Sequence, residues 1–385
     1  MIKLLHTADW HVGKTLRGRS RADEHREVLA EVAAIARDEE VDAVLVGGDL
    51  YDSAAPGPEA EEIVYAALLD LAATGAEVVV VSGNHDNPRR LEAVAPLLEL
   101  GRVHVQTRFQ APAGGGVRHI ETRSGERLAI ALLPFLSQRH VIHAADLLGK
   151  DADAHNQTYA DRISRVVALL CSDLDPGSVN VLLGHTTITN AVHGGGERLA
   201  HTVFDYSVAA TVFPSSLHYV ALGHLHRSQS LPAACPVRYC GSPLQLDFGE
   251  KEDAKSVLVV EASPGVPAQV REVPLRSGRP LRTIRATMAE LESLAGTTGD
   301  AYLRIRIKEA PRVGLADEVR DIFSEAVDVM VDDPQRPESK TVESRVGKSP
   351  RELFAAYLEE RAASDPQVLD LFDELMEEAD APAAS

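Results

Sequence analysis

The stretch EVVVVSGNHD, residues 77–86, determines how the rest of this sequence is interpreted. Four consecutive valines are typical of a strand buried on both faces, as in the sheets of α/β proteins. The strand passes through Ser82 and Gly83 directly into three residue types that bind ligands, Asn84, His85 and Asp86. Since open α/β sheets carry their sites at the carboxyl ends of the strands, this stretch predicts a buried strand and a functional site together.

Four other apolar runs end in the same way. Glycine precedes the ligand-type residue in most of them, and it allows the backbone to turn sharply close to a ligand. The runs are IKLL (2–5) before HTADWH, DAVLV (42–46) before GGD, VNVLL (179–183) before GH, and HYVA (218–221) before LGHLH. The five strand ends carry seven candidate metal ligands: Asp9, His11, Asp49, Asn84, His185, His224 and His226.

These residue types indicate two divalent ions. Asp9 and His11 are one residue apart, as are His224 and His226, and on an extended segment such pairs point the same way. Imidazole and carboxylate without thiolate suit manganese, iron or zinc. Seven ligands suit two ions that share a bridging carboxylate, the arrangement used for displacement at phosphorus. A single histidine after a strand is common without a metal, so the prediction depends on five such pieces in order.

The composition is that of a globular protein of one large or two to three smaller domains, with 385 residues, 44% of them hydrophobic. No apolar run approaches the 18 residues of a membrane helix, and the start MIKLLHTADWHVG lacks the pattern of a signal peptide. We therefore expect a cytoplasmic protein without membrane contact. Cys171 is isolated, and Cys235 and Cys240 lie five apart with no matching second pair, so the cysteines predict neither a disulfide framework nor a zinc ribbon.

The net charge of −19 argues against broad binding of nucleic acid by a basic surface. It leaves open a site that holds phosphate through metal ions. The charge is also uneven, because residues 351–385 contain ten acidic and two basic residues.

The alternation of strands and helices predicts an α/β domain over residues 1–275. Its helices are expected at 20–39, 58–73, 88–98 and 158–172. A small β-α-β-α-β domain is expected over 276–332, then a polar linker over 333–348. Residues 349–385 predict two amphipathic helices and an acidic tail. These helices either pack on their own domain or present an apolar stripe to a partner.

Five motifs together resemble a known family. They resemble the signature of the calcineurin-like metallophosphoesterases. In this sequence they are Asp9-x-His11, Gly48-Asp49, Gly83-Asn84-His85-Asp86, Gly184-His185 and Gly223-His224-x-His226. Within that superfamily, roughly residues 1–250 are similar to the SbcD family of nuclease subunits. The stretches that carry this similarity are LLHTADWHVG, GGDLYD, GNHD, GHLHR and YCGSP. The resemblance implies a two-sheet α/β sandwich flanked by helices, a small α+β capping domain and C-terminal helices that bind a partner.

The resemblance also implies roles for the site residues. Asp9, His11, Asp49 and His226 would hold one Mn²⁺, and Asp49, Asn84, His185 and His224 the other. His85 would stabilise developing charge or protonate the leaving oxygen, with Asp86 orienting it. Chemistry supports a general acid here, since a two-ion site already supplies its nucleophile. The alternative for His85 is a residue that only hydrogen-bonds to the ligands.

The activity implied by the resemblance is that of a metal-dependent DNA nuclease in repair, recombination and replication. It would be a 3′→5′ exonuclease on double-strand ends and an endonuclease on hairpins and single strands. The implied partner is an SbcC-type coiled-coil ATPase, in a heterotetramer that contains a homodimer of this chain. The chain has no P-loop, which assigns ATP hydrolysis to that partner. The alternatives are a protein phosphatase or cyclic-nucleotide phosphodiesterase of the same superfamily, and a non-catalytic scaffold for DNA ends.

Overall fold

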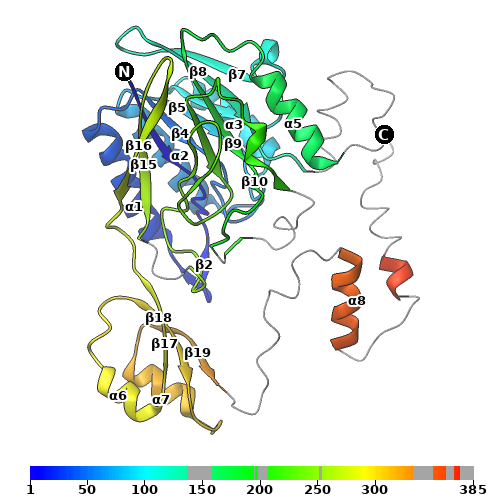
Figure 1. Ribbon diagram of the computed structural model, residues 1–385. Coiled ribbons are helices and arrows are strands. Elements are labelled where there is room, and N and C mark those ends of the chain that lie inside the picture. Colours follow the sequence, from blue (N-terminus) through cyan, green and yellow to red (C-terminus); the bar gives the residue numbers. More distant parts are fainter. Residues whose placement is uncertain are drawn as a thin grey trace.

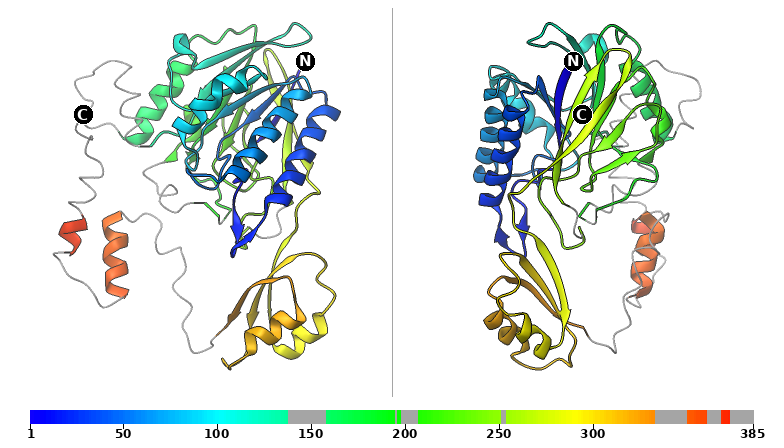
Figure 2. Two further views of the ribbon diagram at one scale, coloured as in Figure 1. Left: turned by 180° about the vertical axis from the view of Figure 1, so that it is seen from behind. Right: turned by 60° about the vertical axis from the view of Figure 1, so that its left-hand side comes forward.

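Two six-stranded sheets face each other in the main body of the computed structural model (Figures 1 and 2). The structure describes residues 1–137, 158–194, 196–197, 207–250, 254–332, 350–360 and 368–372. The first sheet has the order β16 (Val266–Pro274), β15 (Ser256–Ser263), β1 (Ile2–Thr7), β4 (Ala43–Val46), β5 (Glu77–Val81) and β6 (Val103–Gln106). The second has the order β13 (Gln229–Leu231), β14 (Val237–Tyr239), β12 (Tyr219–Gly223), β9 (Val179–His185), β8 (Arg127–Leu133) and β7 (Val117–Glu121). The predicted two-sheet sandwich is confirmed.

The central strands of each sheet are parallel. In the first sheet β1, β4, β5 and β6 pair in parallel, and in the second sheet β8, β9, β12 and β14 do. The antiparallel strands lie at the outer sides, with β15 against β1 and β7 against β8. Parallel pairing brings the carboxyl ends of the central strands to one edge of each sheet, which is where the candidate ligands follow.

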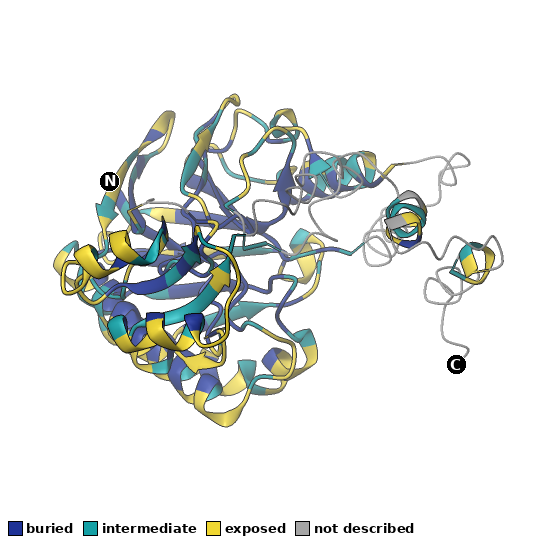
Figure 3. Ribbon diagram, turned by 90° about the horizontal axis from the view of Figure 1, so that it is seen from below, coloured by how far each residue is buried: buried dark blue, intermediate teal, exposed yellow. Residues whose placement is uncertain are grey.

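Helices cover the outer faces of both sheets. On the first sheet lie α1 (Ala22–Asp38), α2 (Pro58–Ala73) and α3 (Pro88–Glu99), and on the second lies α5 (Tyr159–Leu170). The valine run of β5 shows why its strand is continuously apolar. Val79 and Val81 pack between the sheets, while Val78 and Val80 pack under the helices. Figure 3 shows the central strands of the main body as buried and the outer sides of its helices as exposed.

The predicted helices agree with those of the structure to within about two residues at each end, and that over 58–73 has the same bounds. The sequence also predicts strands at LAIALL (128–133), VRYC (237–240) and SVLVV (256–260), which are β8, β14 and β15, so four strands of the two large sheets were not predicted: β6, β7, β13 and β16. The reason is visible in β16, most of whose residues are exposed or half-buried. Such an outer strand carries no apolar run to identify it.

A third sheet lies below the main body in Figure 1. Its parallel strands are β17 (Leu281–Ala286), β18 (Tyr302–Ile307) and β19 (Ala326–Val331). The helices α6 (Met288–Leu294) and α7 (Leu315–Ile322) bury the inner residues of these strands. The order of elements is the predicted one, and the domain boundaries at 276 and 333 stay predictions.

A short hairpin of the main body contacts this third sheet. The hairpin consists of β2 (Thr15–Leu16) and β3 (Arg19–Ser20). Leu16 packs in a small cluster with Leu281 and Tyr302, and Arg17 forms an ion pair of 2.8 Å with Asp328.

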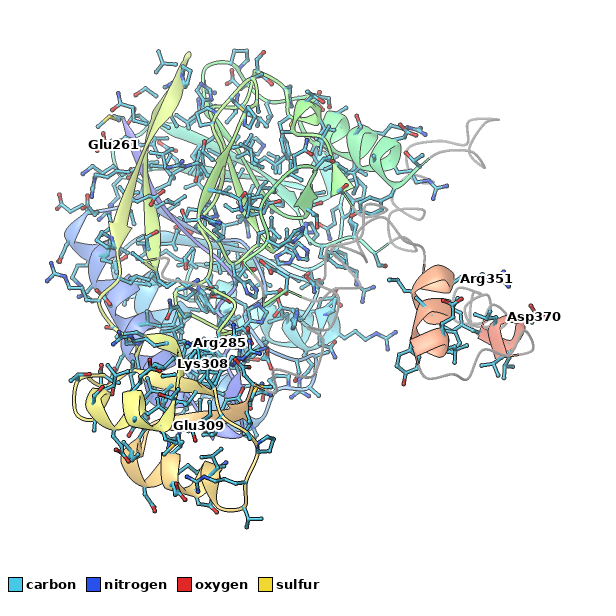
Figure 4. The ribbon with its side chains drawn as sticks, turned by 60° about the horizontal axis from the view of Figure 1, so that its bottom comes forward. Glu261, Arg285, Lys308, Glu309, Arg351 and Asp370 are labelled. Atoms are coloured by element: carbon cyan, nitrogen blue, oxygen red, sulfur yellow. The ribbon has the colours of Figure 1, made fainter. Side chains whose placement is uncertain are left out.

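The described part of the C-terminal region is helical. It comprises α8 (Pro350–Glu360) and the helical residues 368–372. Phe354 stacks on Phe372 at 4.4 Å, and Arg351 lies 3.6 Å from Asp370 (Figure 4). The predicted linker over 333–348 and the end of the acidic tail lie outside the described residues. Within the described part of the chain, no helix is long and apolar enough to cross a membrane.

Candidate metal centre

All seven candidate ligands come to one place, where the carboxyl ends of the two sheets meet. They follow β1, β4 and β5 of the first sheet and β9 and β12 of the second. Six of them are buried, and Asn84 is half-buried. The residues are Asp9, His11, Asp49, Asn84, His185, His224 and His226.

One group of ligand atoms gathers around Asp9. Potential ligand atoms of Asp9, His11 and Asp49 all lie within 4.8 Å of one another. His226 joins them, since its Nε2 lies 3.1 Å from Nε2 of His11. The carboxylate of Asp9 also accepts the backbone N–H of His224, which ties β1 of the first sheet to β12 of the second.

A second group adjoins the first and shares Asp49 with it. Asp49, His185 and His224 again have ligand atoms within 4.8 Å of one another. Oδ1 of Asn84 lies 2.9 Å from Nε2 of His185 and 2.8 Å from Nδ1 of His224. Asp49 is therefore the one residue that belongs to both groups.

The donor atoms of this second group fit a cation. Nδ1 of His185 lies 2.7 Å from the carbonyl oxygen of Gly47, to which it donates its proton. Burial lowers the pKa of His185 to about 4, so the ring is neutral and its Nε2 presents a lone pair. That lone pair faces Oδ1 of Asn84 at 2.9 Å. Two lone pairs at this distance repel each other, and a divalent ion bound by both atoms removes the repulsion.

The electrostatics of the centre also favour a cation. Burial raises the pKa of Asp9 well above its usual value, and the charge of Asp49 adds to the effect. Burial likewise raises the pKa of Asp86 to about 7, again with a contribution from Asp49. Burial lowers the pKa of His11 well below its usual value. The raised carboxyl pKa values mean that these buried carboxylates lack compensating positive charge, which a divalent ion supplies, and the chain binds a divalent metal here.

The backbone of the centre is held in an unusual conformation. Asp9, His11, Asp49 and His224 have φ values of 54°, 49°, 53° and 108°. They make up half of the eight non-glycine residues with positive φ in the described ranges. Such residues cost on the order of 1 kcal/mol or more each, and they concentrate at functional sites. The expectation that each pair converges by alternation along an extended segment is therefore wrong, because left-handed turns aim these side chains.

Close packing explains the glycine that follows β5. A Cβ on Gly83 would lie only 2.1 Å from Oδ1 of Asp49. The same Oδ1 accepts the backbone N–H of His85 at 2.7 Å. The shared carboxylate thus packs directly against the GNHD turn, with no room for a side chain between them.

His85 is not a member of either group, although potential ligand atoms of His85, His11 and Asp52 also lie within 4.8 Å of one another. Its ring meets that of His11 edge to face, with centroids 4.6 Å apart. Nδ1 of His85 lies 2.7 Å from the carbonyl oxygen of Asp52 and donates to it, which fixes the ring. The carboxylate of Asp86 accepts the backbone N–H groups of Gly83 and Tyr51, at 2.8 and 3.2 Å. The Asp52 carbonyl therefore holds the ring, and Asp86 holds the loop that carries it.

Glu250 is a residue of the centre that the sequence analysis missed. Its buried carboxylate lies 3.0 Å from Nδ1 of His226 and 2.7 Å from Nζ of Lys255. It stands in the acidic stretch FGEKEDAK, where no pattern separates it from Glu252 or Asp253. Its distance to His226 is the only signal, and that needs the fold.

A cleft of about 630 Å³ opens beside the second group. Asn84 and Asp86 line it on the metal side. Arg89, Phe109 and Phe135 line the remainder, and the Phe135 ring lies 6.3 Å from that of His224. A substrate in this cleft would meet the centre at Asn84.

Comparison with known proteins identifies the family of the chain. The family model described as calcineurin-like phosphoesterase matches residues 2–228. The chain therefore belongs to the calcineurin-like phosphoesterase family.

Three relatives define the chain further. It is 34% identical to the SbcD subunit of the SbcCD nuclease from Bacillus subtilis (strain 168), over 99% of this chain and all of that protein. It is 38% identical to the protein of the same name from Rhodobacter capsulatus, over 74% of this chain and 71% of the relative. The Escherichia coli K12 protein of the same name is 29% identical, over 75% and 72%. Within the phosphoesterases, the chain belongs to the SbcD family.

Proposed function

We propose that this chain is the nuclease subunit of an SbcCD-type complex and hydrolyses phosphodiester bonds of DNA with two Mn²⁺ ions. The observation that carries the proposal is the position of Asp49, which belongs to two adjoining groups of ligand atoms. A carboxylate between two such groups is what a two-ion phosphoesterase centre requires. The names of the relatives support a nuclease rather than another phosphoesterase.

Each ion has four proposed ligands. Asp9, His11, Asp49 and His226 hold the first, in line with the contact between His11 and His226. The second ion is held by Asp49, Asn84, His185 and His224. Nδ1 of His224 lies 3.2 Å from Nε2 of His185, and Oδ1 of Asn84 lies within 2.9 Å of both nitrogens. When bound, the two ions offset the charge of the phosphate and activate the attacking water.

His85 is the proposed general acid of the reaction. Because its Nδ1 donates to the carbonyl oxygen of Asp52, the proton that this ring can transfer is the one on Nε2. The ring is buried next to His11, at the border of the first ligand group. From there it protonates the oxygen that leaves phosphorus, or stabilises the charge that develops on it. Asp86 contributes by fixing the backbone of the same turn.

The proposed substrates are DNA ends and hairpins. The chain would act as a 3′→5′ exonuclease on duplex ends and as an endonuclease on hairpins and single strands. The net charge of −19 makes the metal centre, rather than a basic surface, the element that attracts phosphate.

The proposed partner is a coiled-coil ATPase of the SbcC type, bound by the C-terminal helices. Phe354 stacks on Phe372, and Tyr357 of α8 remains 46% exposed. Deletion of residues 349–385 should leave basal nuclease activity intact and abolish co-purification with the ATPase. A truncated chain that still binds the ATPase would contradict the assignment.

A homodimer through α2 and α3 is also proposed. Leu97 and Leu100 are 70% and 86% exposed, and Leu69 of α2 is 47% exposed. A Cβ on Gly101 would lie 3.0 Å from Cδ2 of Leu69, so the end of α3 adjoins α2 at these leucines. Exposed leucines that lie together favour a second copy of the chain as the occupant.

The proposed function is tested by cleavage of a linear duplex with Mn²⁺, with and without the ATPase partner. We expect end-dependent cleavage that the partner stimulates, that a circular duplex resists, and that His85→Ala abolishes. Phosphoserine peptide and cyclic AMP are the competing substrates, and faster turnover of either would favour another phosphoesterase. Normal assembly with DNA and ATPase but no cleavage under any condition would favour a scaffold.

A further inference from the structure

A buried ion pair stands directly behind His226. The side chain of Glu250 is 1% exposed, and its Oε1 lies 3.0 Å from Nδ1 of His226. The other carboxylate oxygen accepts from Nζ of Lys255 at 2.7 Å and from the backbone N–H of Leu246 at 3.1 Å. Both oxygens of the carboxylate are therefore engaged, and its charge is balanced by Lys255.

Lys255 also holds the backbone of His226. Its Nζ lies 3.0 Å from the carbonyl oxygen of His226 and 2.9 Å from Oγ of Ser242. The backbone N–H of Ser242 donates to the same carbonyl oxygen at 3.2 Å. A Cβ on Gly241 would lie 2.7 Å from that oxygen. Gly241 and Ser242 of the YCGSP motif thus pack against the backbone of His226. The reaction itself gives these two residues no role.

A glycine covers the pair from another side. A Cβ on Gly196 would lie 2.9 Å from Oε1 of Glu250 and 2.9 Å from Nδ1 of His226. The hydrogen bond between them is thus closely packed, and both side chains are at most 2% exposed. In such surroundings an imidazole has no water to replace its partner.

We propose that Glu250, backed by Lys255, is a positioning residue that keeps the proton of His226 on Nδ1, so that Nε2 presents its lone pair to the metal. The inference rests on the proposed role of His226 as a ligand. Nε2 of His226 faces Nε2 of His11 at 3.1 Å, on the side of the ring away from Glu250. A carboxylate that accepts the second N–H of a ligand histidine fixes its tautomer and makes it a stronger ligand.

The surroundings of Glu250 predict what an isosteric amide would do. Lys255 and the N–H of Leu246 both donate to the same oxygen of Glu250. In Glu250→Gln they hold the amide oxygen, so the amide NH₂ faces Nδ1 of His226. Nδ1 then has to accept, and the ring proton moves to Nε2, the atom that should bind the metal.

The first test measures Mn²⁺ binding to the full-length chain by electron paramagnetic resonance, without DNA. Glu250→Gln should weaken binding at one ion about 10–100-fold. Glu261→Gln is the matched control, because Glu261 lies half-buried on β15 and away from the centre (Figure 4). In a His226→Ala background, Glu250→Gln should cause no further loss. Unchanged affinity in the single variant, or a full additional loss in the double variant, would overturn the proposal.

The second test needs no variant at Glu250, and so does not depend on whether Glu250→Gln folds. Nitrogen-15 NMR of histidine-labelled, metal-free wild-type protein reports the protonation of each ring, with His226→Gln to assign the signal. At a pH where the ring carries a single proton, we expect that proton on Nδ1 of His226, and a single proton on Nε2 would refute the inference. The first test measures metal affinity and the second measures ring protonation, and neither depends on DNA cleavage. A protein that fails to cleave DNA would therefore count against the proposed function but would not decide the role of Glu250.

Discussion

Gly83→Ala should disable the centre through a single methyl group. The added Cβ would lie 2.1 Å from Oδ1, 2.4 Å from the backbone nitrogen and 2.7 Å from Cγ of Asp49. Real Cβ contacts stay above 3.0 Å, so Oδ1 of Asp49 must move by about 0.9 Å and its backbone nitrogen by about 0.6 Å to restore that distance. Gly83 has no positive φ, so alanine adds the methyl group without backbone strain.

A displacement of this size is large for a metal centre. Ligand distances at a functional metal site tolerate only about 0.2 Å, and a displacement of about 1 Å can lower a rate about 100-fold. Because Asp49 belongs to both ligand groups, a shift of its carboxylate affects both ions at once. We therefore expect a loss of cleavage of at least about 100-fold, while overpacking lowers the free energy of unfolding by only about 1–3 kcal/mol.

The assay compares Mn²⁺ affinity, nuclease rate and urea unfolding of Gly83→Ala with those of Gly57→Ala. Gly57 precedes α2, and a Cβ there would meet nothing within 4 Å. The control should match the wild type in Mn²⁺ affinity and nuclease rate, and its free energy of unfolding should fall by no more than about 1 kcal/mol, because Gly57 is the N-cap of α2. If Gly83→Ala retained Mn²⁺ affinity and rate within about twofold, the described packing of Asp49 against the GNHD turn would be refuted.

Three further predictions test other parts of the structure. His85→Ala should still bind two Mn²⁺ ions while its cleavage rate falls about 100–10,000-fold, measured by metal titration and kinetics; loss of an ion would make His85 a ligand. Burial lowers the pKa of His6 to about 3, so its neutral form stabilises the fold above about pH 6.5, and this contribution is lost as the pH falls toward 3. Urea unfolding at several pH values should therefore show that the wild type loses stability on acidification faster than His6→Gln, by up to about 1.4 kcal/mol per pH unit; equal slopes would exclude this effect. Leu97→Asp with Leu100→Asp should convert the dimer to a monomer in sedimentation, whereas Val313→Asp, at a fully exposed position, should leave the dimer unchanged; a dimer that survives the double substitution would place the interface elsewhere.

The sequence allowed the ligand-bearing strands to be predicted because burial on both faces leaves a continuous apolar run. The valines of β5 and the leucines of β9 are examples. Parallel strands of one sheet end at a common edge, so the residues after the runs of each sheet were expected to meet at that edge. That the edges of the two sheets face each other, and so bring all seven candidates together, follows only from the fold. The outer strand β16 was not predictable in this way, because its exposed residues obey no such constraint.

Two features of the site could not be predicted from the sequence for a different reason. The left-handed turns at Asp9, His11, Asp49 and His224 occur at residues that seldom adopt them, and only the surrounding packing maintains them. Glu250 acts across 24 residues of chain on His226, a separation that leaves no local pattern. The position of Asp86, bonded to backbone N–H groups instead of the His85 ring, likewise depends on the loop geometry.

The most direct test of the two-ion centre is anomalous diffraction from crystals of the full-length chain grown with Mn²⁺. The structure predicts two manganese peaks with Asp49 between them, one bound by His11 and His226 and the other by His185 and His224. It also predicts that His85 ligates neither ion. A single peak, or two peaks that do not share Asp49, would contradict the proposed two-ion centre.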